Sequence, residues 1–260
     1  MFCHALSISC NNRRRLLQNA AFMYAGIPQP MTFRAVTPAH PQDPDSYGPL
    51  LLEMQKEYGF DVRTLWSGVG VKAVKKCCTL SHMLAAYFAK ANGWPYALVF
   101  EDDAWPMLGA AETYNAVLEA GGAGAGFVKC GFNGRLDGPE ADVKVVPYRN
   151  TAGSHAYVIF QKFYDGFIKR ALAEFAPADY VVTDEVQDAF TLNRPAFIQF
   201  NSSLYSDQAV NISSKTSGQA VYIDNHVYGG ECPAGYARFE DVLKYMGEID
   251  ATLAKRAKES

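Results

Sequence analysis

One segment of the sequence constrains the fold more than any other, namely the apolar run Tyr96–Phe100 and the three acids that follow it. A continuous apolar run bounded upstream by glycine and proline is typical of a central strand that is covered on both faces. The run ends in Glu101, Asp102 and Asp103, and ligands of open α/β sheets bind at the carboxyl ends of strands. The segment therefore predicts an α/β fold with a functional site at the end of this strand.

Strand-like and helix-like segments alternate along the chain, which favours a mostly parallel sheet with helices on both faces. Apolar runs predict strands at His4–Ser9, Thr32–Val36, Tyr96–Phe100, Phe127–Cys130, Ala156–Phe160 and Ala196–Phe200. Helical spacing predicts helices at Arg13–Ala25, Leu51–Tyr58, Lys72–Asn92, Ala110–Ala120, Lys162–Phe175 and Glu240–Lys258. The proline-rich stretch Pro38–Pro49 and the polar stretch Asn201–Gln219 are expected to be loops.

Length and composition fit one domain, and no internal repeat or linker divides the chain. A chain of 260 residues can bury a full core without disulfides or metals. The composition, 49% hydrophobic and 20% charged, excludes an intrinsically disordered chain. With 24 basic and 27 acidic residues the net charge is −3, whereas domains that hold nucleic-acid phosphates carry an excess of positive charge. We therefore expect a single domain over residues 1–260 that does not bind nucleic acid.

The cysteines and the N-terminal segment indicate a reducing compartment. The six cysteines contain no C-x-x-C pair, so a structural zinc is not expected. No basic segment precedes the first apolar residues, as it would in a signal peptide, and no apolar run is long enough to cross a bilayer. These features predict a cytoplasmic protein with reduced thiols and no transmembrane segment.

The acidic triplet predicts a site for a divalent metal. Adjacent carboxylates repel one another and raise one another's pKa, and a bound divalent cation supplies the missing positive charge. Mg²⁺ and Mn²⁺ suit such a site because they bind carboxylate oxygens and keep coordination positions for substrate phosphates. A nucleotide diphosphate fits these positions and is a good leaving group for glycosyl transfer. The alternative is a solvated turn in which one acid caps a helix.

Several short motifs resemble, in the same order, those of one enzyme family. Leu98–Asp103 resembles the L-V-x-E-D-D strand of glycosyltransferase family 25, and Cys78–His82 resembles its C-x-L-S-H helix. This family contains the lipopolysaccharide-type galactosyltransferases and the collagen hydroxylysine galactosyltransferases. Further segments similar to the family are Arg13–Arg15, Phe33–Val36, Asn150–Ile159 and Ser206–Asp207. The chain departs from the pattern at Cys77, where the family has glycine, and in the proline-rich stretch, which has no counterpart.

The resemblance implies a GT-A fold, which is a single Rossmann-like domain. Residues 1–130 would bind the nucleotide sugar, and residues 131–260 would bind the acceptor. The implied activity is metal-dependent, inverting transfer of a hexose such as galactose or glucose from a UDP-sugar to a hydroxyl of a glycan or other acceptor. Glu101 and Asp103 would bind Mn²⁺ or Mg²⁺, and Asp102 between them would belong to the nucleotide site.

Arginine, serine and histidine side chains complete the implied nucleotide site. Three arginines follow the first predicted strand, namely Arg13, Arg14 and Arg15. At least one of them is expected to contact the uracil or the diphosphate, and a solvated helix start is the alternative. Ser81, His82 and His155 are the other implied contacts. For both histidines the alternative is a hydrogen-bonded residue of the core.

Inversion requires a base that takes the proton of the acceptor hydroxyl on the face opposite the leaving group. The segment that matches the family's late acidic motif offers Asp179, Asp184, Glu185 and Asp188. Asp184 and Asp188 are four residues apart and would share one helix face, where pairing raises one pKa toward the range of a base. Asp184 is the preferred base, and a solvated helix start rich in acids is the alternative.

Two other functions place similar demands on the fold. A phosphohydrolase of the haloacid dehalogenase type also has acids after a buried strand, but its first acid must be aspartate, and here it is Glu101. A catalytically inactive sugar-nucleotide-binding or scaffold protein would keep the fold without needing the carboxylates. Metal-dependent binding of a nucleotide diphosphate separates the scaffold from the enzyme.

Overall fold

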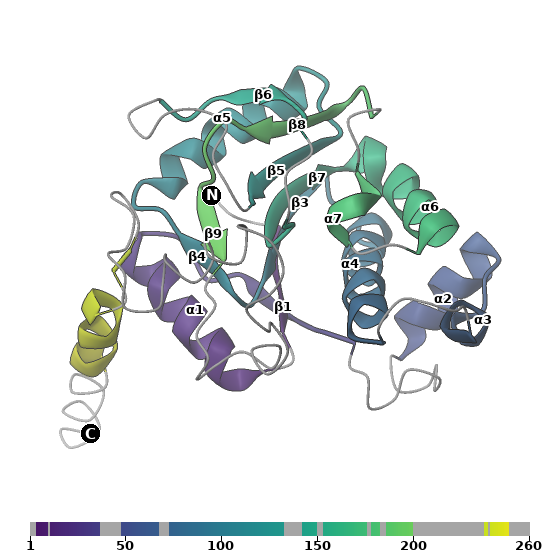
Figure 1. Ribbon diagram of the computed structural model, residues 1–260, viewed down its shortest axis with the longest axis horizontal. Helices are drawn as coiled ribbons and strands as arrows, with labels where there is room; N and C mark the ends of the chain where they lie inside the picture. The colour runs from purple at the N-terminus through teal and green to yellow at the C-terminus, as the bar shows by residue number, and fades with distance from the viewer. Residues whose placement is uncertain are drawn as a thin grey trace, which may run out of the picture.

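The computed structural model shows a central sheet with helices on both sides (Figure 1). It describes residues 4–9, 11–36, 48–67, 73–132, 142–149, 153–175, 178–182, 186–199, 237–238 and 240–249. In these ranges, no helix has both the length and the apolar character needed to span a membrane. The predicted loops at Pro38–Pro49 and Asn201–Gln219 fall almost wholly or wholly outside these ranges.

Nine strands of the described chain join in one sheet. Seven follow the order β2-β1-β3-β7-β5-β8-β6, while β9 pairs with β4 and β5 beside this path. The strands are β1 (Ala5–Ser9), β2 (Met31–Arg34), β3 (Tyr96–Glu101), β4 (Ala104–Pro106), β5 (Phe127–Gly131), β6 (Val145–Pro147), β7 (Ala156–Phe160), β8 (Ala189–Leu192) and β9 (Phe197–Gln199). The apolar run at 96–100 is therefore an interior strand, β3, with β1 on one side and β7 on the other.

The directions of the strands confirm the prediction of a mostly parallel sheet only in part. β2, β1 and β3 run parallel, as expected. β7 is antiparallel to both of its neighbours, β3 and β5, and β6 is antiparallel to β8. A strand buried on both faces is a continuous apolar run in either direction, so the sequence pattern does not reveal its direction. The chain is an α/β protein, and its described sheet is mixed.

Two layers of helices cover opposite faces of the sheet (Figure 1). On one face lie α1 (Asn12–Tyr24) and α5 (Ala110–Gly122); on the other lie α4 (Ala73–Ala91), α6 (Tyr164–Glu174) and α7 (Ala178–Val181), with α2 (Pro49–Tyr58) and α3 (Val62–Ser67) beside α4. Because side chains alternate along a strand, each face has its own apolar core. Val99 and Tyr157 belong to the core beneath α4, and Leu98 and Val158 belong to the core beneath α5.

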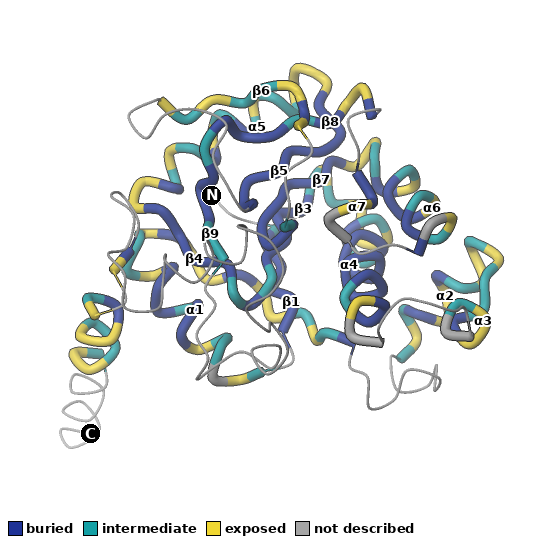
Figure 2. Tube along the Cα trace, in the orientation of Figure 1, coloured by how far each residue is buried: buried dark blue, intermediate teal, exposed yellow. Residues whose placement is uncertain are grey.

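Helix α4 lies between the sheet and the outer helices, and Figure 2 shows it buried over most of its length. Every residue from 79 to 87 is buried. Such a helix is apolar nearly all round, and a polar residue within it must find its partners inside the protein. His82, which is fully buried, therefore has to be bonded to the sheet or to a neighbouring helix.

The longer predicted elements agree with the structure to within a few residues at each end, whereas several short elements were not predicted. The unpredicted elements are β4, β6, β8, α3, α7 and a 3-10 turn at Gln161–Phe163. Elements of three to six residues are too short to show a period. Residues 240–249 are helical, as predicted for the start of Glu240–Lys258. Val242 of this helix packs in a small core with Leu17 and Trp105.

Candidate functional site

The carboxyl ends of β1 and β3 lie side by side and carry the acidic triplet. The two strands are parallel, and Ile8 is in register with Glu101. The next residues, Ser9 and Asp102, are therefore neighbours, and the Ser9 hydroxyl donates a hydrogen bond of 2.7 Å to Asp102 Oδ2. Helix α1 begins directly after β1, so its first turns are also close to the acids. This arrangement agrees with the expected position of a ligand site at the strand ends.

Arg14 in the first turn of α1 binds two of the three acids. Its Nη2 atom lies 2.8 Å from Asp102 Oδ1 and 3.0 Å from Asp103 Oδ2. Gln199 of β9 donates a further hydrogen bond of 3.0 Å to Asp103 Oδ2. Burial raises the pKa of Asp102 to about 6 even though Arg14 opposes the shift. Burial raises the pKa of Asp103 in the same way, again against the effect of Arg14.

Glu101 interacts with helix α4 instead. Its Oε1 atom is 3.1 Å from Nε2 of His82, and Nδ1 of His82 is 2.8 Å from the hydroxyl of Tyr157 on β7. Burial acts to raise the pKa of Glu101, but the hydrogen bond and charge of His82, with smaller contributions from His155 and Arg14, lower it overall. His82 is thus both a buried histidine with two hydrogen-bonding partners and a direct contact of the acidic triplet.

His155 directly precedes β7, and its carbonyl accepts a hydrogen bond of 2.9 Å from the Glu101 amide. Its Nε2 atom is 2.9 Å from the Phe197 carbonyl oxygen and must carry the hydrogen, because a carbonyl can only accept. Burial lowers the pKa of His155, which favours the neutral ring. Nδ1 is buried and has no hydrogen-bond partner among the described residues, and the same is true of Asp103 Oδ1.

A glycine allows His155 to pack in this position. A Cβ atom at Gly131, the last residue of β5, would come within 2.6 Å of the His155 ring. The register of β5 against β7 also shifts between Lys129 and Gly131, which is an irregularity in an otherwise continuous ladder. The close approach thus explains why β5 ends in glycine beside the candidate site.

Asp103, Glu101 and His155 are the side chains that this end of the sheet offers to a ligand, whereas the described group whose ligand atoms all lie within 4.8 Å of one another is Cys78, His82 and Glu101. Asp103 Oδ1 is a carboxylate oxygen without a partner, Glu101 offers a second carboxylate, and His155 offers a neutral nitrogen.

The remaining nucleotide-site predictions have different positions. The Ser81 hydroxyl is buried, accepts a hydrogen bond from the Val36 amide and donates one to the Cys77 carbonyl, so it connects α4 to the segment after β2. Arg15 extends toward Thr32 on β2, at a distance of 3.5 Å, and not toward the acids. The side chain of Arg13 lies outside the described residues.

Asp188, the predicted base whose side chain lies among the described residues, is not at this end of the sheet. Asp188 precedes β8, its carbonyl accepts from the amides of Gly126 and Phe127 at the start of β5, and its carboxylate pairs with Lys162 at 2.9 Å. β5 and β3 run in the same direction. Asp188 lies at the amino end of β5 and Glu101 at the carboxyl end of β3, so the two residues are at opposite ends of the strands. Asp188 is therefore not near the acidic triplet. Asp184, Glu185 and the Asp179 side chain lie outside the described residues.

Sequence reasoning missed three residues that bind the predicted ones: Ser9, Tyr157 and Gln199. Ser9 could have been found, since it is the last residue of a predicted strand next to the acidic strand. Tyr157 was visible only as part of a motif, and no local signal relates Gln199 to Asp103.

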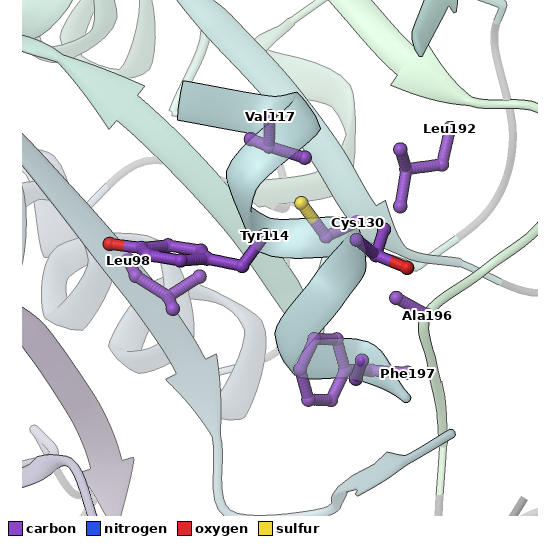
Figure 3. Close-up of a pocket in the computed structure, with 9 residues that line it drawn as sticks. Leu98, Tyr114, Val117, Cys130, Leu192, Ala196 and Phe197 are labelled. Atoms are coloured by element: carbon purple, nitrogen blue, oxygen red, sulfur yellow. The ribbon is translucent and has the colours of Figure 1, made fainter. Parts of the chain in front are cut away.

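A small apolar cavity lies on the other face of the sheet, beneath α5 (Figure 3). It is lined mainly by Leu98, Val117, Leu192, Ala196 and Phe197. The cavity is part of the α5 core, on the face opposite His82, and offers no charged group to a nucleotide.

No protein-family model matches this sequence, and a search of curated proteins finds no match.

Proposed function

We propose that the chain is a metal-dependent inverting glycosyltransferase that moves a hexose from a UDP-sugar to a hydroxyl acceptor. The observation that carries the proposal is a pair of buried polar atoms, Asp103 Oδ1 and His155 Nδ1, that lack partners among the described residues beside Glu101. Buried polar groups are nearly always paired. Two such atoms at the end of the sheet where the parallel strands β1 and β3 finish favour a ligand that supplies positive charge.

When bound, a divalent cation at this edge supplies the charge that holds a diphosphate and stabilises it as a leaving group. The residues of the chain prepare the site for that ligand. The Phe197 carbonyl fixes the tautomer of His155, which leaves Nδ1 as the nitrogen available to a ligand. Arg14 and Gln199 both bind Asp103 Oδ2, which leaves Oδ1 as the oxygen that faces the ligand.

Arg14 is the arginine of the basic cluster that supports the proposal. A guanidinium held beside two aspartates can also reach a phosphate oxygen, since it carries five donors in a fixed plane. The proton of the acceptor hydroxyl would be taken by the carboxylate of Asp184 or Glu185. Asp188 is not proposed as the base, because it lies at the end of the sheet opposite the acidic triplet. Asp184 remains the preferred base.

The binding protein without catalytic activity is the second candidate, and Arg14 favours it. Its two ion pairs with Asp102 and Asp103 already supply positive charge to the triplet, so the fold does not require a metal for neutralisation. The two candidates differ in turnover and not in the geometry of the site.

Titration calorimetry with Mn²⁺ and UDP tests the proposal. We expect UDP to bind at least tenfold more tightly with Mn²⁺ than without it, and Asp103→Asn to remove that difference at a temperature where the variant is folded. Asp165→Asn, an exposed carboxylate on α6, is the matched control and should bind like the parent. Equal binding of Mn²⁺ and UDP by parent and Asp103→Asn would rule out the site.

Metal-dependent hydrolysis of a panel of sugar nucleotides separates the enzyme from the scaffold. The transferase is expected to hydrolyse one donor slowly in the absence of acceptor. Binding of UDP with no turnover of any donor, and none with added hydroxyl acceptors, would leave the binding protein as the function.

A further inference from the structure

A second group of potential ligands lies on the α4 side of Glu101. Cys78 and His82 are four residues apart on α4 and therefore share one face of the helix. With Glu101 of β3 they form a group in which one ligand atom from each side chain lies within 4.8 Å of the other two. The group consists of a thiol, an imidazole and a carboxylate. The cation site proposed for the UDP-sugar consists of carboxylates and His155.

The surroundings of His82 are those of a histidine that binds a metal. Nε2 points at Glu101, 3.1 Å away, and Nδ1 is held by the Tyr157 hydroxyl at 2.8 Å. Histidines that bind metals usually donate their other ring N–H to an oxygen, which fixes the orientation of the ring. His82 is fully buried, Cys78 is half-buried and Glu101 is one-quarter exposed. His82 is thus held in place by its two hydrogen bonds, and solvent can reach the group on the side of Cys78 and Glu101.

We propose that Cys78 Sγ, His82 Nε2 and a carboxylate oxygen of Glu101 bind one Zn²⁺ ion, with the fourth position left to water. Zinc combines sulfur, nitrogen and oxygen ligands in tetrahedral sites, and three protein ligands with one open position are typical of zinc sites that are not purely structural. Ligand atoms around tetrahedral zinc lie roughly 3.5 Å apart, so rotation of the Cys78 and Glu101 side chains closes the group. Binding removes the thiol proton of Cys78, and the His82 hydrogen is then carried by Nδ1, which donates it to the Tyr157 hydroxyl.

This site differs from the structural zinc that the cysteine spacing excludes. It takes one ligand from the adjacent pair Cys77-Cys78 and so needs no two thiols from one segment. A thiolate and an imidazole also select zinc over Mg²⁺ and Mn²⁺, which prefer oxygen ligands.

The zinc site goes beyond the proposed transferase function, but the two share Glu101. Zinc bound at Cys78 and His82 would hold the carboxylate on the α4 side and withdraw it from the cation at Asp103 and His155. Zinc and Mn²⁺ are therefore expected to compete for the carboxylate of Glu101. The zinc site itself needs no nucleotide and no turnover.

Titration of the full, tag-free and reduced chain with Co²⁺ tests the site without an activity measurement. Cobalt bound to a thiolate gives a charge-transfer absorption in the near ultraviolet, and we expect it to reach its maximum at one Co²⁺ per chain and to disappear on addition of Zn²⁺. Cys78→Ala should remove this absorption. Cys77→Ala changes the neighbouring buried thiol and should keep it, which makes it the matched control.

Two further variants keep the result interpretable. Tyr157→Phe retains all three ligands but removes the hydrogen bond to His82, and should weaken Co²⁺ binding by 10-fold to 100-fold, as changes around metal ligands typically do. Asp103→Asn retains Cys78, His82 and Glu101 and should keep the thiolate absorption, so the zinc site can stand where the transferase proposal fails. A parent without the thiolate absorption, or a Cys78→Ala variant that retains it, would overturn the zinc site.

Discussion

The chain contains two clusters of opposite charges that resemble each other in composition and differ in environment. At the strand ends, Arg14, Asp102 and Asp103 have side chains that are 16%, 8% and 11% exposed. On the far side of α4, Lys90 connects α2 and α6 by binding Glu57 and Asp165, and these three side chains are 28%, 44% and 55% exposed. The cluster at the strand ends is therefore largely buried, and the cluster at Lys90 is partly exposed to solvent.

The difference shows what each cluster contributes. In the surface cluster Lys90 meets Glu57, Asp165 and the Tyr58 hydroxyl, and water solvates the rest, so the charges link three helices at little cost. In the buried cluster each charge has lost its water, and Asp103 Oδ1 has gained no partner among the described residues. Such a cost at the edge of a sheet is expected where a ligand binds.

The largest effect is expected from Arg14→Ala. This change leaves Asp102 and Asp103 buried without their shared counter-charge, and breaking a buried pair typically costs about 3–5 kcal/mol. The free energy of unfolding from urea denaturation measures the loss. Saturating Mn²⁺ should restore part of it, because a cation bound only to the folded chain stabilises that chain.

Arg15→Ala is the matched control for Arg14→Ala. Arg15 interacts with Thr32 on an exposed part of the surface, so its removal should change the free energy of unfolding by less than about 0.5 kcal/mol. If the two variants lost the same free energy of unfolding, the buried cluster would contribute no more to stability than a surface contact does. That result would contradict the contrast between the clusters.

A smaller effect is expected from Gly131→Ala, which tests whether His155 must sit where it does. The new methyl group would meet the His155 ring and the Ala156 side chain at under 3 Å, and overpacking of this kind typically costs about 1–3 kcal/mol. Calorimetry should also show weaker Mn²⁺ binding, since His155 Nδ1 is displaced.

Gly122→Ala provides the reference for that change. A Cβ atom at this helical glycine meets nothing within 4 Å, so alanine should leave stability unchanged or raise it by up to about 1 kcal/mol. Unchanged Mn²⁺ binding in Gly131→Ala together with a normal melting temperature would show that the ring has room to move and that its position is not critical.

The smallest effect is expected from Lys90→Met, which keeps the aliphatic stem and removes the charge from the surface cluster. The loss should stay below about 1 kcal/mol and shrink further in high salt, because exposed ion pairs are screened. Denaturation of parent and variant at low and high salt measures it. A loss as large as that of Arg14→Ala would contradict the contrast between the clusters.

The same variant should show a defined pH dependence. Hydrogen bonding to Lys90 lowers the pKa of Glu57 below its usual 4.5 and that of Asp165 below its usual 3.8. Both carboxylates thus bind fewer protons in the folded state, and their contribution is complete above the usual values and lost as the pH falls through the lowered ones. The difference between parent and Lys90→Met should be constant from neutral pH to about pH 5 and decrease below it.

The fold was predictable where the chain carries a periodic signal. The run at 96–100 and the spacing along α4 gave a buried strand and a helix at nearly their observed bounds. The direction of β7 was not predictable, because its apolar run AYVIF is equally suited to either direction. The three-residue strands β4 and β6 depend on pairing with distant segments and carry no pattern of their own.

The candidate site was predictable in its acids but not in their partners. Clustered carboxylates at a strand end are visible in the sequence, and the parallel neighbour β1 explains why α1 lies close to them. Glu101 binds His82 of α4, whereas Asp102 and Asp103 bind Arg14 of α1. The sequence did not indicate that the three acids have different partners. Residues far apart in the sequence meet only through the tertiary packing of two different layers.

The insertion of β7 between β3 and β5 has a consequence for how the chain is made. Synthesis produces β1, β2, β3 and β5 before β7, so the sheet cannot close at its centre until the chain has grown past Phe160. Until then β3 and β5 each expose an unpaired apolar edge, which is the kind of surface that pairs with other chains. A nascent or truncated chain that ends before Ala156 should therefore aggregate, and the two ends of the sequence cannot be separated into independently folding halves.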